Sequence, residues 1–248
     1  MSLDKATRTR LVGLLDLTEL GESADAAAND RLCIRATTPL GPVAAVCLWP
    51  AFVGQAKRLL GGTRIRIATV VNFPSGEEAT EQVAAAIAKA LADGADEIDY
   101  VLPYRRLLAG DHEAPRAGVA AARRAAGDAV LKVILETGEL GEPQKIAEAS
   151  RIALGEGADF LKTSTGKVSV NATLPAARIM LEEISRAGGR AGFKAAGGIR
   201  DGETALAYVT LAEEILGAGR ARPKTFRIGA SGLLDALMEN EQTGAGRY

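Results

Sequence analysis

The chain has 248 residues, of which 47% are hydrophobic and 25% charged, and this ordinary globular composition argues against disorder throughout. Its formal net charge is -1, so no global positive field favours a nucleic acid or an anionic membrane as a partner. Two cysteines without a CxxC spacing argue against a disulfide scaffold, and a single histidine excludes a zinc site built on several imidazoles.

The N-terminal segment MSLDKATRTRLVGLLDLTEL mixes both charge signs and lacks a long apolar stretch, so it does not predict a signal peptide. No apolar run in the chain is long enough to span a bilayer. Together with a cysteine usage that fits a reducing compartment, these features predict a cytoplasmic protein without a membrane partner. The histidine, His112, lies in the polar stretch AGDHEAP and is expected to be a solvated loop residue.

Short apolar or β-branched runs alternate along the chain with longer amphipathic stretches, which is the pattern of strand–helix units around a parallel sheet. After a short helical segment expected over about residues 1–12, eight such runs follow. They begin at Leu14, Val43, Ile65, Asp96, Val130, Asp159, Gly192 and Phe226. Among the intervening stretches, DGETALAYVTLAEEILGAG predicts a helix that opens on Asp201 as its N-cap and ends in glycine.

Eight strand–helix units predict a (β/α)8 TIM barrel. The barrel would use residues 1–248 as one domain, with a C-terminal tail over about residues 240–248, because no Pro/Ser-rich linker divides the chain. An open, doubly wound sheet is the alternative. It would place the glycine pattern GxGxxG after the first strand, and DLTELGES does not supply that pattern.

Polar side chains recur on the face of the strands that is expected to point into the barrel. Side chains alternate between faces, so Phe160 and Ser164 share the face of Lys162. The same test assigns to the interior Asp16, Thr18, Cys47, Asp99, Lys132, Lys162 and Lys194. A lysine in a strand ordinarily faces solvent. However, VLKVIL places Lys132 in an unbroken apolar run that is typical of a strand covered on both faces, and GFKAAGGIR does the same for Lys194.

Grouped lysines have a specific chemical use. A free lysine has a pKa of about 10.4, so it is protonated and not nucleophilic at neutral pH. A second ammonium group close by, together with desolvation, lowers that pKa and yields a neutral amine that attacks a carbonyl. An ionised aspartate then serves as the proton acceptor or relay. The set therefore predicts Schiff-base chemistry on an aldehyde or ketone, with neither a metal nor an organic cofactor.

Two other interpretations of the segment DFLKTSTGK fail. A nucleotide P-loop needs glycine five residues before Gly166 and Ser or Thr after Lys167, and this chain has Leu161 and Val168 at those positions. A metal-dependent aldolase would polarise its substrate with a zinc ion held by histidines, and one histidine cannot build that site.

Five segments carry a resemblance to a known family: DEIDYVLPYRRLLAGD, LKVILETGEL, GADFLKTSTGKVSVNAT, GFKAAGGIR and RIGASGLLDAL. In their order and spacing they resemble the 2-deoxyribose-5-phosphate aldolases, which are class I aldolases on a TIM barrel. The similarity runs from LLDLTEL to the C-terminus. It implies reversible cleavage of 2-deoxy-D-ribose 5-phosphate to acetaldehyde and D-glyceraldehyde 3-phosphate in deoxyribonucleotide catabolism. The implied partners are these small molecules, and a homodimer or homotetramer is open.

The resemblance also implies a role for each matching residue. Lys162 matches the Schiff-base nucleophile, Lys194 the second lysine that tunes it, and Asp99 the partner in proton relay. Four further residues match polar positions that line the family's substrate pocket: Asp16, Thr18, Cys47 and Lys132. The family often has proline at the position of Ala195, and a second serine at the position of Gly232.

Three glycine-containing segments fall at the ends of the last three expected strands. In TIM barrels a phosphate is often bound by the loops after strands seven and eight with a short helix N-terminus, which SGLLDALM supplies. We therefore expect the phosphate at Gly166, Lys167, Gly197, Gly198, Ser231 and Gly232, with Thr165 beside it and Lys167 as the only full positive charge. Tyr248, the last residue, is a candidate to reach into the site, or else it belongs to a disordered end.

Two alternatives to an aldolase stay open at this point. One is another phosphosugar enzyme on the same fold, such as an isomerase or a transaldolase, and the other is a barrel that only binds a phosphorylated metabolite. An isomerase would use a carboxylate or a histidine as its base, and a binding protein has no need of a lysine with a lowered pKa. The lysine pair therefore favours the aldolase.

Overall fold

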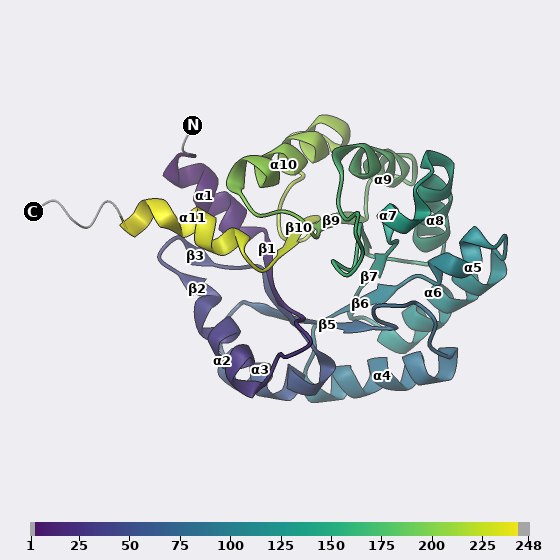
Figure 1. Cartoon of the computed structure of the whole chain (residues 1–248), viewed down its shortest axis with the longest axis horizontal. Coiled ribbons are helices and arrows are strands. Elements are labelled where there is room, and N and C mark those ends of the chain that lie inside the picture. The colour runs from purple at the N-terminus through teal and green to yellow at the C-terminus, as the bar shows by residue number, and fades with distance from the viewer. Residues whose placement is uncertain (1–2, 243–248) are drawn as a thin grey trace, which may run out of the picture.

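A computed structural model describes residues 3–242 of the chain (Figure 1). Eight parallel strands close into a barrel in the order β1-β10-β9-β8-β7-β6-β5-β4. These strands are β1 (Leu15–Glu19), β4 (Ala45–Leu48), β5 (Arg66–Val71), β6 (Glu97–Val101), β7 (Val130–Ile134), β8 (Phe160–Lys162), β9 (Gly192–Ala196) and β10 (Phe226–Ala230). Each of the eight apolar runs of the sequence contains one of them, so the predicted TIM barrel is confirmed.

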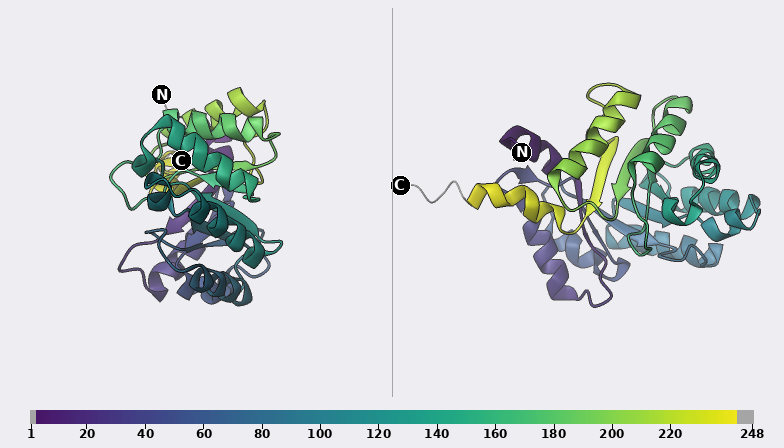
Figure 2. Two further views of the ribbon diagram at one scale, coloured as in Figure 1. Left: turned by 90° about the vertical axis from the view of Figure 1, so that its right-hand side faces the viewer. Right: turned by 45° about the horizontal axis from the view of Figure 1, so that its top comes forward.

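Helices form a ring around the barrel, and α1 and α11 lie side by side (Figure 2). Their bounds are α1 (Lys5–Gly13), α2 (Ala26–Arg35), α3 (Val53–Leu59), α4 (Thr80–Asp93), α5 (Tyr104–Leu108), α6 (Glu113–Ala126), α7 (Thr137–Leu140), α8 (Pro143–Gly155), α9 (Leu174–Arg186), α10 (Gly202–Leu216) and α11 (Leu233–Gln242), with a 3-10 turn over Pro50–Phe52. Two short strands, β2 (Thr37–Thr38) and β3 (Gly41–Pro42), pair antiparallel in a loop where no strand was expected.

Local signals explain where several helices begin and end. The carboxylate of Asp201 accepts a hydrogen bond from the backbone N–H of Thr204 at 2.8 Å, so α10 starts at the expected N-cap. Asp4 caps α1 in the same way through Thr7, at 2.7 Å. At the other end of α4, Gly94 takes the left-handed conformation with φ 109°.

The strands are buried on both faces, as parallel barrel strands are. On β7, Leu131 and Val133 belong to the main apolar core under the helices, and Lys132 between them is fully buried. The same alternation on β9 sends Phe193 to the helix layer and Lys194 to the barrel interior, where it pairs with carboxylates of other strands. Strand alternation therefore concentrates the charged side chains inside the barrel.

Candidate active site

Three lysines from three adjacent strands converge on one carboxylate. Asp99 of β6 lies beside Lys132 of β7 in the strand register, and Lys162 of β8 lies beside Lys194 of β9. The Nζ atoms of Lys132 and Lys162 both lie 2.7 Å from an oxygen of Asp99, and that of Lys194 lies 2.8 Å away. Each of the four side chains is at most 3% exposed. The sequence prediction brought these four residues together correctly.

The charge cluster extends beyond these four residues. Lys194 also donates to Asp16 at 2.6 Å, and Lys132 lies 2.6 Å from Glu97. Arg227 of β10 donates to Asp16 at 2.6 Å and makes two hydrogen bonds to Glu97, at 2.7 and 3.1 Å. Sequence reasoning missed Arg227 and Glu97. Glu97 stands two residues before Asp99, so strand alternation could have assigned it to the interior.

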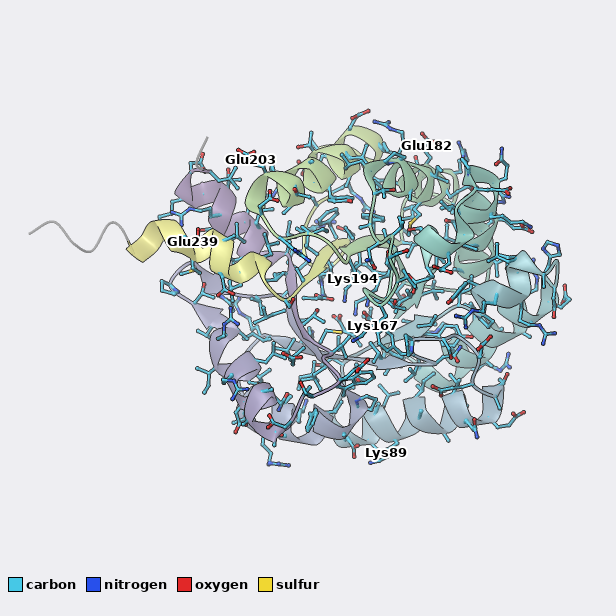
Figure 3. All side chains as sticks on the ribbon, viewed as in Figure 1. Lys89, Lys167, Glu182, Lys194, Glu203 and Glu239 are labelled. Atoms are coloured by element: carbon cyan, nitrogen blue, oxygen red, sulfur yellow. The ribbon has the colours of Figure 1, made fainter. Side chains whose placement is uncertain are left out.

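Close packing fixes the position of Lys194. Gly229 on the neighbouring strand β10 leaves room for it, because a Cβ atom at residue 229 would lie 3.0 Å from the Cε atom of Lys194. Figure 3 shows Lys194 and Lys167 near the centre of the ring of strands. The side chain of Lys194 is therefore held by two carboxylates on one side and by close packing on the other.

The surroundings of the three lysines shift their pKa values in different directions. Burial and the nearby ammonium of Lys194 lower the pKa of Lys162, although the Asp99 carboxylate opposes them. Burial also lowers the pKa of Lys194 and of Lys132, but two or more carboxylates around each outweigh it and raise the pKa above its usual value. Burial raises the pKa of Asp99, and the three lysines outweigh it and hold that pKa well below its usual range. Lys162 is thus the lysine of this cluster that is most readily neutral.

A cavity of about 620 Å³ opens above Lys162, at the C-terminal ends of the strands. Its walls include Lys162 and eight of the residues expected to bind substrate: Thr18, Thr165, Gly166, Lys167, Gly197, Gly198, Ser231 and Gly232. Ser231 and Gly232 directly precede α11, so the positive end of that helix lies at the cavity. A buried amine, a polar cavity and a helix N-terminus thus occur together.

The cavity carries two cationic side chains. Nζ of Lys167 donates to the backbone oxygen of Leu20 at 2.7 Å, and Arg200 lines the same cavity. The expectation that Lys167 supplies the only full positive charge is therefore corrected. Arg200 escaped notice because it follows the glycine pair of AAGGIR, where only backbone amides were considered.

Most of the chain matches one known family. Residues 12–237 match the model described as DeoC/LacD family aldolase. The chain belongs to the DeoC/LacD family of aldolases. A relative from Agrobacterium fabrum, named deoxyribose-phosphate aldolase, is 53% identical over 229 residues, which make up 92% of this chain and 88% of that protein. The family inferred from the five sequence segments is therefore confirmed.

Solved structures of similar proteins share the barrel of this aldolase. A crystal structure assigned to a deoxyribose-phosphate aldolase of Coccidioides immitis matches with a TM-score of 0.83 at 30% identity, over 94% of this chain and 86% of that one. The deoxyribose phosphate aldolase of Aeropyrum pernix matches with a TM-score of 0.77 at 24% identity, over 95% and 93% of the two chains. The second likeness is evidence for the fold alone.

Three residues of this aldolase that were expected to line the substrate pocket do not border its cavity. Asp16, Cys47 and Lys132 are fully buried, and the first and last are engaged by the charged groups around them. Burial raises the pKa of the Cys47 thiol. Strand alternation identifies the inward face but not the depth along the barrel axis, so a role of these three residues in binding substrate stays a prediction. Tyr248 lies outside the described residues.

A buried glutamate supports the cavity wall of the aldolase from behind. Glu136 follows β7 with a positive φ of 57° and is fully buried. Its carboxylate accepts a hydrogen bond from the backbone N–H of Thr165 at 3.1 Å and contacts the Thr165 hydroxyl, which in turn accepts from the backbone N–H of Lys167 at 3.0 Å. Burial raises the pKa of Glu136. Sequence reasoning missed this residue, because a glutamate at a strand end carries no pattern of its own.

Of the histidine and the two cysteines, Cys47 lies beside the lysine cluster, and neither His112 nor Cys33 borders the cavity. His112 is half-exposed and pairs with Glu148 at 2.5 Å. Cys33 and Cys47 are both buried free thiols. Within residues 3–242 no group of three histidine, cysteine, aspartate or glutamate side chains is placed to hold a metal ion. In the same range no helix is long and apolar enough to cross a membrane.

Proposed function

We propose that this aldolase reversibly cleaves 2-deoxy-D-ribose 5-phosphate to acetaldehyde and D-glyceraldehyde 3-phosphate through a Schiff base on Lys162. The observation that carries the proposal is the convergence of three buried lysines on Asp99, with only Lys162 reaching the cavity. The 53% identical relative named deoxyribose-phosphate aldolase supports the substrate. The lysine cluster favours this reaction over isomerisation or simple binding, because neither needs a neutral amine.

The chemistry follows from the position of the amine. In its neutral form, Lys162 attacks the aldehyde carbon of the open-chain sugar, and loss of water gives an iminium ion. Removal of the proton from the 3-hydroxyl group lets the C2–C3 bond break, and its electron pair flows into the iminium group. D-Glyceraldehyde 3-phosphate leaves. The remaining enamine is protonated at C2 and hydrolysed to acetaldehyde.

In these steps Asp99 is proposed to accept protons, and Lys194 to tune the pKa of Lys162. One carboxylate oxygen of Asp99 accepts a hydrogen bond from Lys162 at 2.7 Å and another from Lys194 at 2.8 Å. A proton released by Lys162 or taken from the carbinolamine therefore has a carboxylate within hydrogen-bonding distance. Lys194 keeps its own positive charge through Asp16 and Asp99, so it repels the proton on Lys162.

The phosphate is proposed to bind at the far side of the cavity from the amine. The glycine pair Gly197 and Gly198, with φ of 85° and 81°, presents backbone in a conformation that other residues rarely adopt. Ser231 and Gly232 add the N-terminus of α11, and Lys167 and Arg200 add charge. These groups fit a phosphate dianion. A cavity that binds only a neutral sugar would not need them.

We also propose a cytoplasmic location and self-association into dimers or tetramers. Two free, buried thiols are compatible with a reducing compartment. The Aeropyrum pernix deoxyribose phosphate aldolase is described as tetrameric. Light scattering on the purified chain would measure its oligomeric state directly.

Borohydride trapping tests the proposed function. Acetaldehyde and borohydride added to the protein should leave one stable adduct, which peptide mapping should assign to Lys162. The Lys162→Ala variant should lose both the adduct and the cleavage of 2-deoxyribose 5-phosphate. Lys89→Ala, on an exposed lysine of α4, is the matched control. An adduct mainly on Lys132 or Lys194 would overturn the assignment, and catalysis without any adduct would overturn the Schiff base.

A further inference from the structure

Arg227 and Glu97 form the end of the charge cluster that lies away from the cavity. They come from β10 and β6, and both are buried, at 4% and 2% exposure. Glu97 stands two residues before Asp99, toward the N-terminal end of the barrel, and neither Arg227 nor Glu97 lines the cavity. They do not touch Lys162 by any hydrogen bond or ion pair of the described chain. Any effect they have on Lys162 therefore passes through the other charges.

The charges of the cluster do not balance while every lysine is protonated. Ion pairs of 2.6 to 2.8 Å connect seven groups: Asp16, Glu97, Asp99, Lys132, Lys162, Lys194 and Arg227. Four cations face three carboxylates, which leaves one surplus positive charge in a buried space. Loss of the proton from Lys162 brings the net charge of the seven groups to zero. Arg227 cannot make this correction itself, because a guanidinium stays protonated in proteins.

We infer that Arg227 and Glu97 are positioning residues that set the protonation state of Lys162: Arg227 supplies the surplus positive charge that displaces the proton of Lys162, and Glu97 limits that surplus. The inference rests on the proposed Schiff-base function of Lys162. It goes beyond that function because it places control of the nucleophile in two residues that substrate never contacts.

Two routes connect the pair to Lys162, and loss of Arg227 and loss of Glu97 act on the Lys162 proton in opposite directions. Arg227 occupies one oxygen of Asp16 while Lys194 holds the other, so loss of Arg227 leaves Asp16 to neutralise Lys194 more fully. Lys194 then repels the proton on Lys162 less. Glu97 lies 2.6 Å from Lys132, and without Glu97 that lysine would depend on Asp99, at 2.7 Å, and on the more distant Asp16, at 3.9 Å. Asp99 would then hold the proton of Lys162 less strongly.

The other titratable groups near Lys162 do not upset this balance. The residues that face it electrostatically come from β6, β9, β4 and the segment after β7: Asp99, Lys194, Cys47 and Glu136. Burial raises the pKa of the Cys47 thiol and that of the Glu136 carboxyl. In the described part of the chain, neither group shares an ion pair with any of the seven groups of the cluster. The charge count therefore covers the seven groups that direct ion pairs connect.

The test measures the proton on Lys162 directly, without the sugar substrate. Formaldehyde with cyanoborohydride methylates only the neutral amine, and mass spectrometry of the peptide that contains residue 162 gives the rate at each pH. We expect the midpoint of this rate to rise by about one pH unit in Arg227→Met and to fall by about one pH unit in Glu97→Gln. The double variant removes one charge of each sign, so its midpoint should return close to that of the wild type.

Two controls separate charge from packing. Arg227→Lys keeps the positive charge and should restore the midpoint that Arg227→Met shifts. Arg66→Met removes an exposed strand arginine that pairs with Asp96, and its midpoint should equal that of the wild type. Opposite shifts in the two single variants cannot come from a general loosening of the barrel.

Several results would overturn the inference. Unmoved midpoints would do so, as would shifts in the same direction in both single variants, or a failure of both to fold while the double variant folds. A cleavage assay on the wild type tests the proposed function separately from the role of Arg227 and Glu97. A wild type that methylates Lys162 normally but does not cleave 2-deoxyribose 5-phosphate would refute the substrate alone. Normal cleavage with unmoved midpoints would refute only the role of Arg227 and Glu97.

Discussion

Lys162 and Lys194 carry the same ammonium group on adjacent strands, yet their pKa values move in opposite directions: burial lowers both, and the nearby carboxylates outweigh burial at Lys194 but not at Lys162. Lys194 has two carboxylates within 2.8 Å, whereas Lys162 shares one carboxylate with two other lysines. The ratio of carboxylates to lysines around each amine therefore decides which one loses its proton. The type of residue alone does not decide it.

Substitution of Lys194 tests this reasoning. Lys194→Leu removes a neighbouring positive charge and frees carboxylate oxygens, and both changes raise the pKa of Lys162. We expect kcat/KM at pH 7 to fall by about tenfold or more, with the loss shrinking as the pH rises. A pH profile of cleavage measures this, with Lys89→Leu as the control. A loss of equal size at every pH would show that Lys194 acts in another way.

Lys167 and Arg200 test the phosphate site. Each side chain adds a charge to the cavity, so Lys167→Leu and Arg200→Leu should raise KM for 2-deoxyribose 5-phosphate by about tenfold each. The reaction with unphosphorylated 2-deoxyribose should change much less, because that sugar offers no dianion. Steady-state kinetics with both sugars give the comparison. Equal damage to both reactions would move the residue from phosphate binding to the chemistry or the fold.

At the scale of elements, the turn after β9 depends on two glycines for different reasons. Both have a positive φ, but a Cβ atom at Gly198 would meet open space, while one at Gly197 would lie 2.7 Å from the side chain of Asn171. Gly198→Ala should cost about 1 kcal/mol of unfolding free energy from backbone strain, and Gly197→Ala should cost more.

Urea denaturation measures this difference. Gly155→Ala is the matched control, because Gly155 ends α8 without a positive φ and has nothing within 4 Å of the added atom. That variant should be neutral or slightly stabilised. Equal costs at Gly197 and Gly198 would show that Asn171 moves aside freely.

The elements themselves were predictable where a local pattern determines them. Eight apolar runs predicted eight strands, and Asp201 predicted the start of α10 through its side-chain cap. The pair β2 and β3 was missed because two-residue strands are too short to produce an alternating pattern. At the site, alternation found Asp99 and the three lysines. It missed Arg227 and Arg200, since their roles depend on contacts between strands or loops that are distant in sequence.

At the scale of the whole molecule, the buried charges make stability depend on pH. Asp16, Glu97 and Asp99 are buried, which raises their pKa values, but the cations around them outweigh burial and lower each pKa below its usual value. A carboxyl whose pKa is lowered by folding contributes stability that is complete above its unfolded pKa of about 4 and is lost as the pH falls through the folded value. Glu136, whose pKa is raised, contributes in the opposite sense.

Three lowered groups outweigh one raised group, so we expect the urea midpoint to stay nearly constant from pH 7 to pH 5 and to fall below about pH 4. The fall should persist in about 1 M salt, because salt screens surface ion pairs far more than buried ones. Urea denaturation at each pH, with and without salt, measures both effects. A fall that vanishes in salt would assign the pH dependence to surface pairs such as Arg178 with Glu214.

Closure of the barrel between β1 and β10 also determines when the site can exist during synthesis of the chain. Asp16 and Arg227, which hydrogen-bond to each other, are separated by 211 residues. A nascent chain that ends before β10 therefore carries Asp16 and Glu97 without their guanidinium partner, and its first strand has no second neighbour. Every lysine of the cluster is already made by then, but the cluster completes only when nearly the whole chain has left the ribosome.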